Sequence, residues 1–248
     1  MSELSNYIDE YLKTEYTLKS TLKDSVQSSV YLYQKNDSAK QIVKISQKNR
    51  NDHVLRRLRG QLNKNTATIY EVCSNDEDVT VLEEYISGAT LRHIVEANGG
   101  TLKRELAVKY ALDICNGLVF IHSLGIIHRD IKPSNIIITE QGEAVIIDFG
   151  IARLTDDSKY ADTKNLGTAG YAAPEQFGIY QSGPVTDIYA VGVLLNELLL
   201  GVHPTIDTPK GKLGKVINKC IMAQMSKRYQ NVSELAEVLN KLLRRGRK

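Results

Sequence analysis

The sequence contains little cysteine, and its three cysteines follow no metal-binding pattern. Cys73, Cys115 and Cys220 lie far apart, are odd in number, and include no CxxC pair or paired histidine spacing. This arrangement disfavours both a disulfide scaffold and a zinc site. It favours a reducing environment, so we expect the protein to be cytoplasmic.

Long apolar runs and a strong net charge are also missing. The most apolar stretch, IYAVGVLLNELLLGV, is too short to span a bilayer and is interrupted by Asn196 and Glu197. The N-terminal stretch MSELSNYIDEYLK has acidic residues and no apolar core, so we expect no signal peptide. The net charge is +3, from 32 basic and 29 acidic residues, which predicts no general affinity for nucleic acid or membranes. The basic end, RRGRK, fits a solvated helix end better than a lipid- or RNA-binding tail.

Glycine is missing from the first predicted hairpin. The segments LKDSVQSSVYLY and QIVKIS contain alternating apolar residues, which is typical of two strands joined by the polar turn QKNDSAK. A lysine inside the second strand, Lys44, suggests the roof of a phosphate pocket. Such roofs normally contain glycines, because a Cβ atom hinders the approach of backbone N–H groups to phosphate. The hairpin alone leaves open whether it covers a nucleotide.

Hydrophobic periodicity divides the chain into two parts. Residues 1–15 are predicted to form a short amphipathic helix, and residues 16–86 a small β-rich part with one helix over 49–62. Residues 87–248 are predicted to be mostly helical, after a connector near ISGAT. The strand segments of the first part are YTLKSTL, SSVYLYQ, QIVKIS, TIYEVC and VTVLEEY.

Local signals predict where the later elements begin and end. One helix is expected to start at Thr101 as its N-cap, and another to cover 186–200 and end at Gly201. The last helix is expected to begin near Asn231, with Glu234 as its capping partner. Between them, NIIIT and AVIID are short strand-type runs that flank the turn EQGE.

The stretch GIIHRDIKPSNIIITEQGEAVIIDFGIAR contains the residues with the clearest chemistry. Asp130 and Asn135 share a loop, and Asp148 follows a strand 18 residues after Asp130. An Asn and an Asp that converge on one site offer the oxygen ligands that Mg²⁺ takes together with substrate phosphates. Asp130 is then left to accept a hydroxyl proton, and Lys132 can neutralise charge on a phosphate in transfer.

These motifs resemble those of the protein kinase family. HRDIKPSN is similar to the catalytic loop H-R-D-L-x-x-x-N, DFG at 148–150 to the magnesium motif, and AAPEQ at 172–176 to the A-P-E segment. The resemblance covers about residues 16–243 and is nearest to the bacterial Ser/Thr kinases of Hanks type. It implies an α+β, bilobal protein-kinase-like fold with a small β-rich N-lobe (16–86) and a larger helical C-lobe (87–248).

The resemblance also implies a role for each matching residue. Asp130 would be the catalytic base, Lys132 would contact the γ-phosphate, and Asn135 and Asp148 would bind Mg²⁺ or Mn²⁺. Lys44 in IVKI would hold the α- and β-phosphates of ATP. The other residues expected at ATP are Ser25, Ser28 and Val30 in the roof, and Glu83, Glu84 and Ile86 at the adenine. Three residues would be architectural: Glu175 paired with Arg228, and Asp187 as the anchor of the catalytic loop.

The resemblance further suggests Ser/Thr specificity and regulation by phosphorylation. Lys132 and Thr168 are typical of Ser/Thr kinases of this family. ARLTDDSKYADTKNLGT resembles an activation loop, and Arg129 is placed to pair with a new phosphate there. The candidate phosphorylation sites are Thr155, Ser158, Tyr160 and Thr163. A dimer that phosphorylates itself in trans is an open alternative.

Two positions depart from the family pattern. Lys23, Ser25 and Ser28 stand at the three glycine positions of the roof. The predicted helix over 49–62 should supply a glutamate to Lys44, yet its only acid is Asp52. We therefore expect Glu83, or Asp52 in a shifted helix, to be the carboxylate partner of Lys44.

Two classes of function follow. The first is an ATP- and Mg²⁺-dependent protein Ser/Thr kinase acting on a protein substrate, and the second is a pseudokinase that binds nucleotide or acts as a scaffold. The four residues Asp130, Lys132, Asn135 and Asp148 favour the first, whereas the glycine-free roof and the missing helix glutamate favour the second. A small-molecule kinase is disfavoured by AAPEQ, Thr168 and Arg228.

Overall fold

The computed structural model describes residues 3–26, 28–48, 51–75, 77–156, 167–177 and 181–245. The chain divides into two compact units, one of residues 1–63 and 67–86 and the other of residues 64–66 and 87–248. The short segment 64–66 joins the second unit because Ile146 N–H donates to Asn65 O (2.9 Å) and Asn65 Nδ2 donates to Ala144 O (2.9 Å). The α+β class is confirmed: the first unit is β-rich and the second mainly helical.

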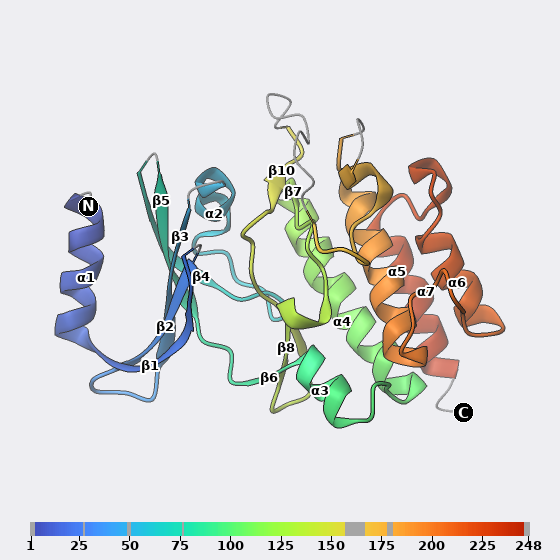
Figure 1. Cartoon of the computed structure of the whole chain (residues 1–248), viewed down its shortest axis with the longest axis horizontal. Helices are drawn as coiled ribbons and strands as arrows, with labels where there is room; N and C mark the ends of the chain where they lie inside the picture. Colours follow the sequence, from blue (N-terminus) through green and yellow to red (C-terminus); the bar gives the residue numbers. More distant parts are fainter. Residues whose placement is uncertain are drawn as a thin grey trace. The chain divides into compact units, whose positions relative to one another are not determined.

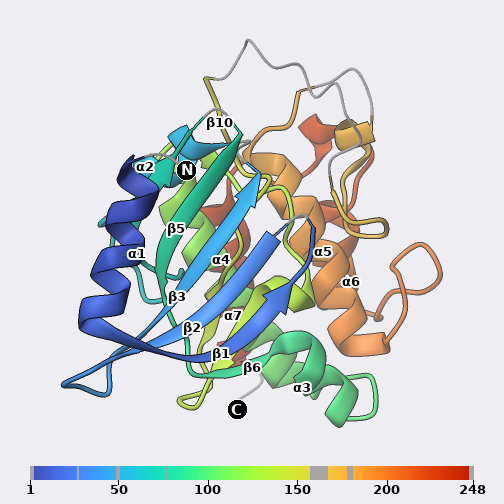
Figure 2. The same cartoon turned by 60° about the vertical axis from the view of Figure 1, so that its left-hand side comes forward.

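The first unit is an antiparallel five-stranded sheet with two helices (Figures 1 and 2). Its strand order is β1-β2-β3-β5-β4. The helix α1 belongs to the same compact unit as this sheet. The elements are α1 (Glu3–Glu15), β1 (Tyr16–Asp24), β2 (Ser28–Lys35), β3 (Gln41–Lys48), α2 (Asp52–Leu58), β4 (Ile69–Ser74) and β5 (Asp78–Glu84).

The two helices of this unit cover opposite faces of the sheet (Figure 1). One apolar cluster joins Ile8 and Leu12 of α1 to Ile42 and Leu82 of the strands, and we name this side the α1 face. On the other side, Asp52 of α2 accepts a hydrogen bond from the Ser74 hydroxyl at 2.7 Å. This second side, the α2 face, also carries Val30, Val43, Ile45 and Glu83 through the alternation of the strands.

The helix α2 is shorter than the sequence predicts. It spans Asp52–Leu58, whereas the apolar spacing predicted a helix over 49–62. The helix ends because Arg59 leaves the helical region (φ −56°, ψ 126°) and Gly60 adopts a φ of +74°. Glycine tolerates this left-handed conformation without the steric cost that a Cβ atom would add.

The second unit is built around the long helix α4, which packs against α5 and α7 (Figure 1). The helices are α3 (Leu91–Ala97), α4 (Arg104–Ser123), α5 (Pro184–Leu200), α6 (Lys212–Cys220) and α7 (Val232–Arg245). Short strands are β6 (Gly88–Thr90), β7 (Ile126–Ile127), β8 (Ile136–Thr139), β9 (Ala144–Ile146) and β10 (Arg153–Leu154). Single 3₁₀ turns cover Pro133–Asn135, Pro174–Phe177 and Met225–Lys227.

The predicted end of α5 and start of α7 are confirmed, whereas α5 begins at Pro184, two residues before the predicted start at 186. Gly201 ends α5 at φ +69°, and at the start of α7 the Glu234 N–H donates to Asn231 Oδ1 at 2.9 Å. The prediction of Thr101 as an N-cap is wrong, because α4 starts at Arg104. The Leu102 N–H instead donates to Leu198 O at 2.7 Å, which holds this segment outside the helix.

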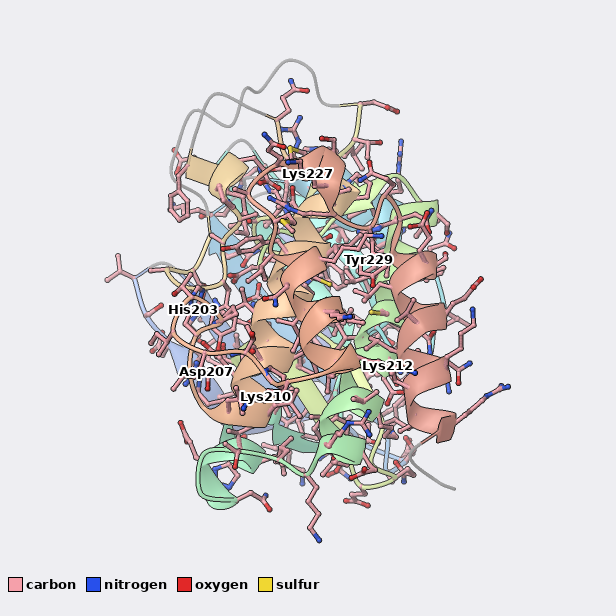
Figure 3. The ribbon with its side chains drawn as sticks, turned by 90° about the vertical axis from the view of Figure 1, so that its right-hand side faces the viewer. His203, Asp207, Lys210, Lys212, Lys227 and Tyr229 are labelled. Carbon is pink, nitrogen blue, oxygen red and sulfur yellow. The ribbon has the colours of Figure 1, made fainter. Side chains whose placement is uncertain are left out.

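Figure 3 shows the side of the second unit where the segment with His203, Asp207 and Lys210 leads into α6. Within this segment, the carbonyls of Val202 and Asp207 accept hydrogen bonds from the buried Asn196 side chain of α5 (2.8 and 2.9 Å). Among the described residues, no helix is long and apolar enough to cross a membrane.

The contribution of α1 to stability can be measured with a matched pair of substitutions. Leu12 is 2% exposed under α1, whereas Leu62 is 78% exposed. We expect Leu12→Ala to lower the free energy of unfolding by about 2–5 kcal/mol and Leu62→Ala by less than about 0.5 kcal/mol. Urea titrations followed by circular dichroism give both values. Equal losses for the two variants would contradict the packing of α1 described above.

Candidate active site

The hairpin of β8 and β9 brings two predicted magnesium ligands to the same end. Ile136 pairs with Ile146, and Ile147 N–H donates to Asn135 O at 3.0 Å. Asn135 therefore enters β8 beside the point where the chain leaves β9 toward Asp148. Asp148 has a φ of +65°, and its Oδ1 accepts a hydrogen bond from Gly150 N–H at 3.0 Å.

Asp130 is the centre of a hydrogen-bond network. Its Oδ2 accepts from Lys132 Nζ at 2.7 Å and from Asn135 Nδ2 at 2.9 Å. Its Oδ1 accepts from the Thr168 hydroxyl at 2.8 Å, and Lys132 Nζ also donates to that hydroxyl oxygen at 2.7 Å. The side chains of Asp130 and Lys132 are 14% and 19% exposed, so both can still be reached from solvent. The network joins a carboxylate, an ammonium group and a hydroxyl within one small volume.

The backbone before Asp130 is held by the buried carboxylate of Asp187 in α5. Asp187 Oδ2 accepts from His128 N–H at 2.9 Å, and its Oδ1 accepts from Arg129 N–H at 2.8 Å. His122 Nε2 lies 2.8 Å from Asp187 Oδ2. Arg129 adopts a φ of +67°, a conformation that costs free energy for a side chain with a Cβ atom. The two hydrogen bonds to Asp187 compensate for this local strain.

The surroundings of Asp187 hold its carboxyl group in the charged form. Burial alone raises the pKa of this carboxyl group. The hydrogen bond and charge of His122, with the nearby His128, lower the pKa by more than burial raises it. The net effect is a pKa below the ordinary value for Asp. The anchor is therefore ionised throughout the neutral range.

A second buried ion pair braces the A-P-E segment. Arg228 donates through both Nη atoms to Glu175, Nη1 to Oε1 at 2.7 Å and Nη2 to Oε2 at 2.8 Å. The neighbouring Gln176 donates from Nε2 to Arg129 O at 3.0 Å, and its Oε1 accepts from Ala173 N–H at 3.0 Å. These bonds tie the segment around residue 175 to the catalytic loop.

The donor set at residues 135 and 148 fits a magnesium ion. The Asn135 amide uses Nδ2 to donate to the carbonyl and the carboxylate of Asp130, both at 2.9 Å, which leaves its Oδ1 as the metal-binding atom. The carboxylate of Asp148 is exposed. No group of three or more His, Cys, Asp or Glu side chains suited to a metal exists among the described residues. Two oxygen ligands completed by phosphates and water are what Mg²⁺ commonly takes.

The predicted regulatory residues are only partly described. Arg129 is 8% exposed, and its Nε donates to Ile151 O at 2.8 Å. Thr155 is exposed, and its N–H donates to Gly125 O at 2.8 Å. The candidate phosphorylation sites Ser158, Tyr160 and Thr163 lie outside the described residues. Phosphorylation of this segment stays a prediction.

The structure corrects the expected partner of Lys44. Lys44 Nζ lies 2.5 Å from Asp9 Oδ1 of α1, not beside Glu83 or Asp52. In the β3–β5 register Lys44 pairs with Leu82 while Val43 pairs with Glu83, so Lys44 and Glu83 point to opposite faces of the sheet. Asp52 instead accepts from the Ser74 hydroxyl on the α2 face. The residues predicted at ATP are thus not all brought together.

The remaining residues predicted at ATP lie in the first unit. Val30 and Glu83 share the α2 face, and Glu83 is 5% exposed. At the turn between β1 and β2, the Ser25 hydroxyl donates to Ser28 O at 2.9 Å and accepts from Ser28 N–H at 3.1 Å. These serines close their own turn. At the predicted adenine segment, Glu84 N–H donates to Thr68 O at 2.9 Å. The adenine contacts of Glu84 and Ile86 stay predictions.

Three residues that hold the residues of the candidate site in place were not predicted from the sequence. Asp9 is one acid among several in an amphipathic helix, and nothing local marks it as a partner of Lys44. His122 lies three residues before the first residue of GIIHRD, and Gln176 follows the A-P-E segment directly. Nearness to these motifs was a signal that could have suggested both residues, because such segments meet in the fold.

The comparisons with known proteins agree with this geometry. The family described as "Protein kinase domain" matches residues 14–247. A probable serine/threonine-protein kinase of Clostridium acetobutylicum is 34% identical over 72% of this chain and 31% of that protein. The kinases named PknB of Bifidobacterium longum and Mycolicibacterium smegmatis are 42% and 40% identical, over 50% and 52% of this chain and 18% and 21% of those proteins. The chain thus covers less than a third of the length of each of these relatives.

Acid should weaken the Asp187 anchor in a defined direction. The folded-state pKa of Asp187 lies below that of the unfolded chain, so its stabilisation is complete above the ordinary Asp pKa, about 4. It is lost as the pH falls through the lower, folded-state value. We expect Asp187→Asn to lower the free energy of unfolding by about 3 kcal/mol at pH 7, with a smaller difference from wild type as the pH falls below about 4.

Denaturant titrations between pH 3 and pH 7 measure this difference. The exposed Asp207 in the same unit is the matched control, and Asp207→Asn should follow the wild-type profile at every pH. A loss for Asp187→Asn that stays constant with pH would show that the carboxylate charge is not what stabilises the loop.

Proposed function

Because the chain belongs to the protein kinase domain family, we propose that it is an ATP- and Mg²⁺-dependent protein serine/threonine kinase. The observation that best supports this is the network in which Asp130 contacts Lys132, Asn135 and Thr168 at 2.7–2.9 Å. The relatives named as serine/threonine-protein kinases support the same activity. Protein kinases in general use ATP and Mg²⁺, so these are the cofactors of the proposal.

Each residue of the network has a step in the proposed reaction. Asp130 accepts the proton of the substrate Ser or Thr hydroxyl, which makes the oxygen a better nucleophile. Lys132 stabilises the negative charge of the γ-phosphoryl group as it transfers. Thr168, through its bonds to both side chains, fixes their relative orientation. Asn135 and Asp148 would hold Mg²⁺, which would supply positive charge to the phosphates.

The proposal also covers the substrates of the kinase and the compartment in which it acts. The substrate is a protein, and the activation segment that contains Ser158, Tyr160 and Thr163 is a second target, through autophosphorylation. All three cysteines are free thiols, in keeping with a reducing cytosol. The pseudokinase alternative rests on the roof without glycines, but a chain without phosphoryl transfer has no chemical need for this network.

Loss of the base or of the metal ligand should abolish the reaction. We expect Asp130→Asn to lower kcat about 10²–10⁴-fold, and Asp148→Asn to remove detectable transfer, because no carboxylate then holds the metal. Labelled ATP with Mg²⁺ or Mn²⁺, followed by mass spectrometry of the phosphorylated residues, gives the rates and the sites. Asp207→Asn is the control and should retain the wild-type rate.

Equal labelling of the wild type and both variants would reveal a contaminating kinase and favour the pseudokinase alternative. A rate per molecule that rises with protein concentration would support autophosphorylation in trans. A rate per molecule that is independent of protein concentration would show that each molecule phosphorylates itself in cis.

Thr168 is a second test, because its hydroxyl bridges Asp130 and Lys132. Thr168→Val keeps the shape but loses both hydrogen bonds, so we expect kcat to fall about tenfold while KM for ATP stays within about twofold. Thr168→Ser retains the hydroxyl and should restore most of the rate. If Ser and Val variants behave alike, the hydroxyl has no part in positioning the base.

A further inference from the structure

The β3 lysine lies on the opposite face of the sheet from the residues expected at the nucleotide. Val30 pairs with Ile45 across β2 and β3, and both point to the α2 face with Glu83. Lys44 pairs with Tyr31 and points to the α1 face. The side chains of neighbouring residues in a strand alternate between faces, so Lys44 cannot join Val30 by a change of rotamer.

Lys44 is also committed to a partner on its own face. Its Nζ lies 2.5 Å from Asp9 Oδ1, and the two side chains are 14% and 35% exposed. Apolar contacts lie on the same face, where Ile8 and Leu12 of α1 belong to one cluster with Ile42 and Leu82. The ion pair therefore fastens α1 to strand β3 of the sheet.

A slip in the register of β3 would be costly. It would move Lys44 to the α2 face, but it would also move Ile42 out of the α1 cluster, where it is 2% exposed. Val43, which is 6% exposed, would leave the α2 face at the same time. Because Ile42 and Val43 are buried on opposite faces of the sheet, the observed register is strongly specified.

Another lysine is available on the α2 face. In the β1–β2 register Lys23 pairs directly with Val30, so both side chains leave the sheet on the same side. Lys23 is exposed, and it stands at the first position where the family's roof has glycine. Lys35 and Lys48 differ in this respect, because their register partners are Tyr16, in the α1 cluster, and Asp78, an ion-pair partner at 2.9 Å.

We propose that Lys44 is a clamp that holds α1 on the sheet through Asp9, and that Lys23 is the lysine that binds the nucleotide phosphates. The second half rests on the proposed function, which requires ATP to bind beside Val30. The missing glutamate of α2 then has a physical explanation. The lysine that it would serve lies on the other face, so α2 needs no carboxylate at that position.

Two measurements on the full chain separate the two lysines. Isothermal titration with AMP-PNP and Mg²⁺ gives the Kd for nucleotide, and thermal denaturation without nucleotide gives Tm. We expect Lys23→Met to raise the Kd about tenfold with Tm within about 1 °C of wild type. We expect Lys44→Met and Asp9→Asn to lower Tm by about 2–4 °C each, with the Kd within about twofold of wild type.

Matched lysines provide the controls. Lys19→Met removes an exposed lysine of the same strand as Lys23, and Lys48→Met removes one from the same strand as Lys44. Neither change should raise the Kd. The double variant Asp9→Asn with Lys44→Met should lose less in Tm than the sum of the two single variants, since the pair is broken only once.

The proposal is overturned if Lys44→Met raises the Kd tenfold while Lys23→Met behaves like Lys19→Met. If Lys44→Met does not fold, Asp9→Asn tests the clamp in its place, because it breaks the ion pair and leaves the lysine. A Tm equal to that of the wild type would then refute the clamp. Additive losses in Tm would refute the clamp without any use of nucleotide. A wild-type protein that binds no AMP-PNP would refute the proposed function and the role of Lys23, and the Tm cycle would still decide the clamp.

Discussion

The carboxylate of Asp187 is fully buried, and the geometry of the catalytic loop depends on the hydrogen bonds that it accepts. His128 and Arg129 donate their backbone N–H groups to its two oxygens, and Arg129 remains at a φ of +67°. A buried charge is costly unless hydrogen bonds satisfy it, and the third contact, from His122, completes this requirement. The strained turn positions Asp130 directly after it, so the charge in α5 determines where the proposed base stands.

Further hydrogen bonds connect the loop that Asp187 holds to more distant segments of the second unit. Arg129 O accepts from Gln176, and Glu175 in turn is held by both Nη atoms of Arg228. The A-P-E segment, the catalytic loop and the residues before α7 are thereby joined by buried groups. In a low dielectric, a buried polar group that loses its hydrogen-bond partner is costly. The loss of one member of this network would therefore affect the others. The same property lets the site hold Asp130, Lys132 and Thr168 in one arrangement.

The sequence predicted the second unit better than the first for a physical reason. In the second unit, short motifs such as HRDIKPSN contain the loop residues together with their near neighbours, so position in the motif indicates position in space. In β3 the segment IVKI has apolar residues at both parities, and Ile42 and Val43 are buried on opposite faces of the sheet. Alternation then cannot say which face Lys44 takes. Its partner Asp9 lies 35 residues away, and no local pattern connects them.

A sheet covered on both faces also changes what a strand lysine can do. On a face that a helix covers, an ammonium group must find a carboxylate or stay in contact with water, and α1 provides Asp9 for this purpose. The same helix covers Ile42 and Leu82, so the charged contact and the apolar contacts favour a single register of β3. The departure from the family pattern at α2 thus corresponds to the face on which Lys44 lies. Because the ion pair with Asp9 keeps Lys44 on the α1 face, a glutamate in α2 could not reach it.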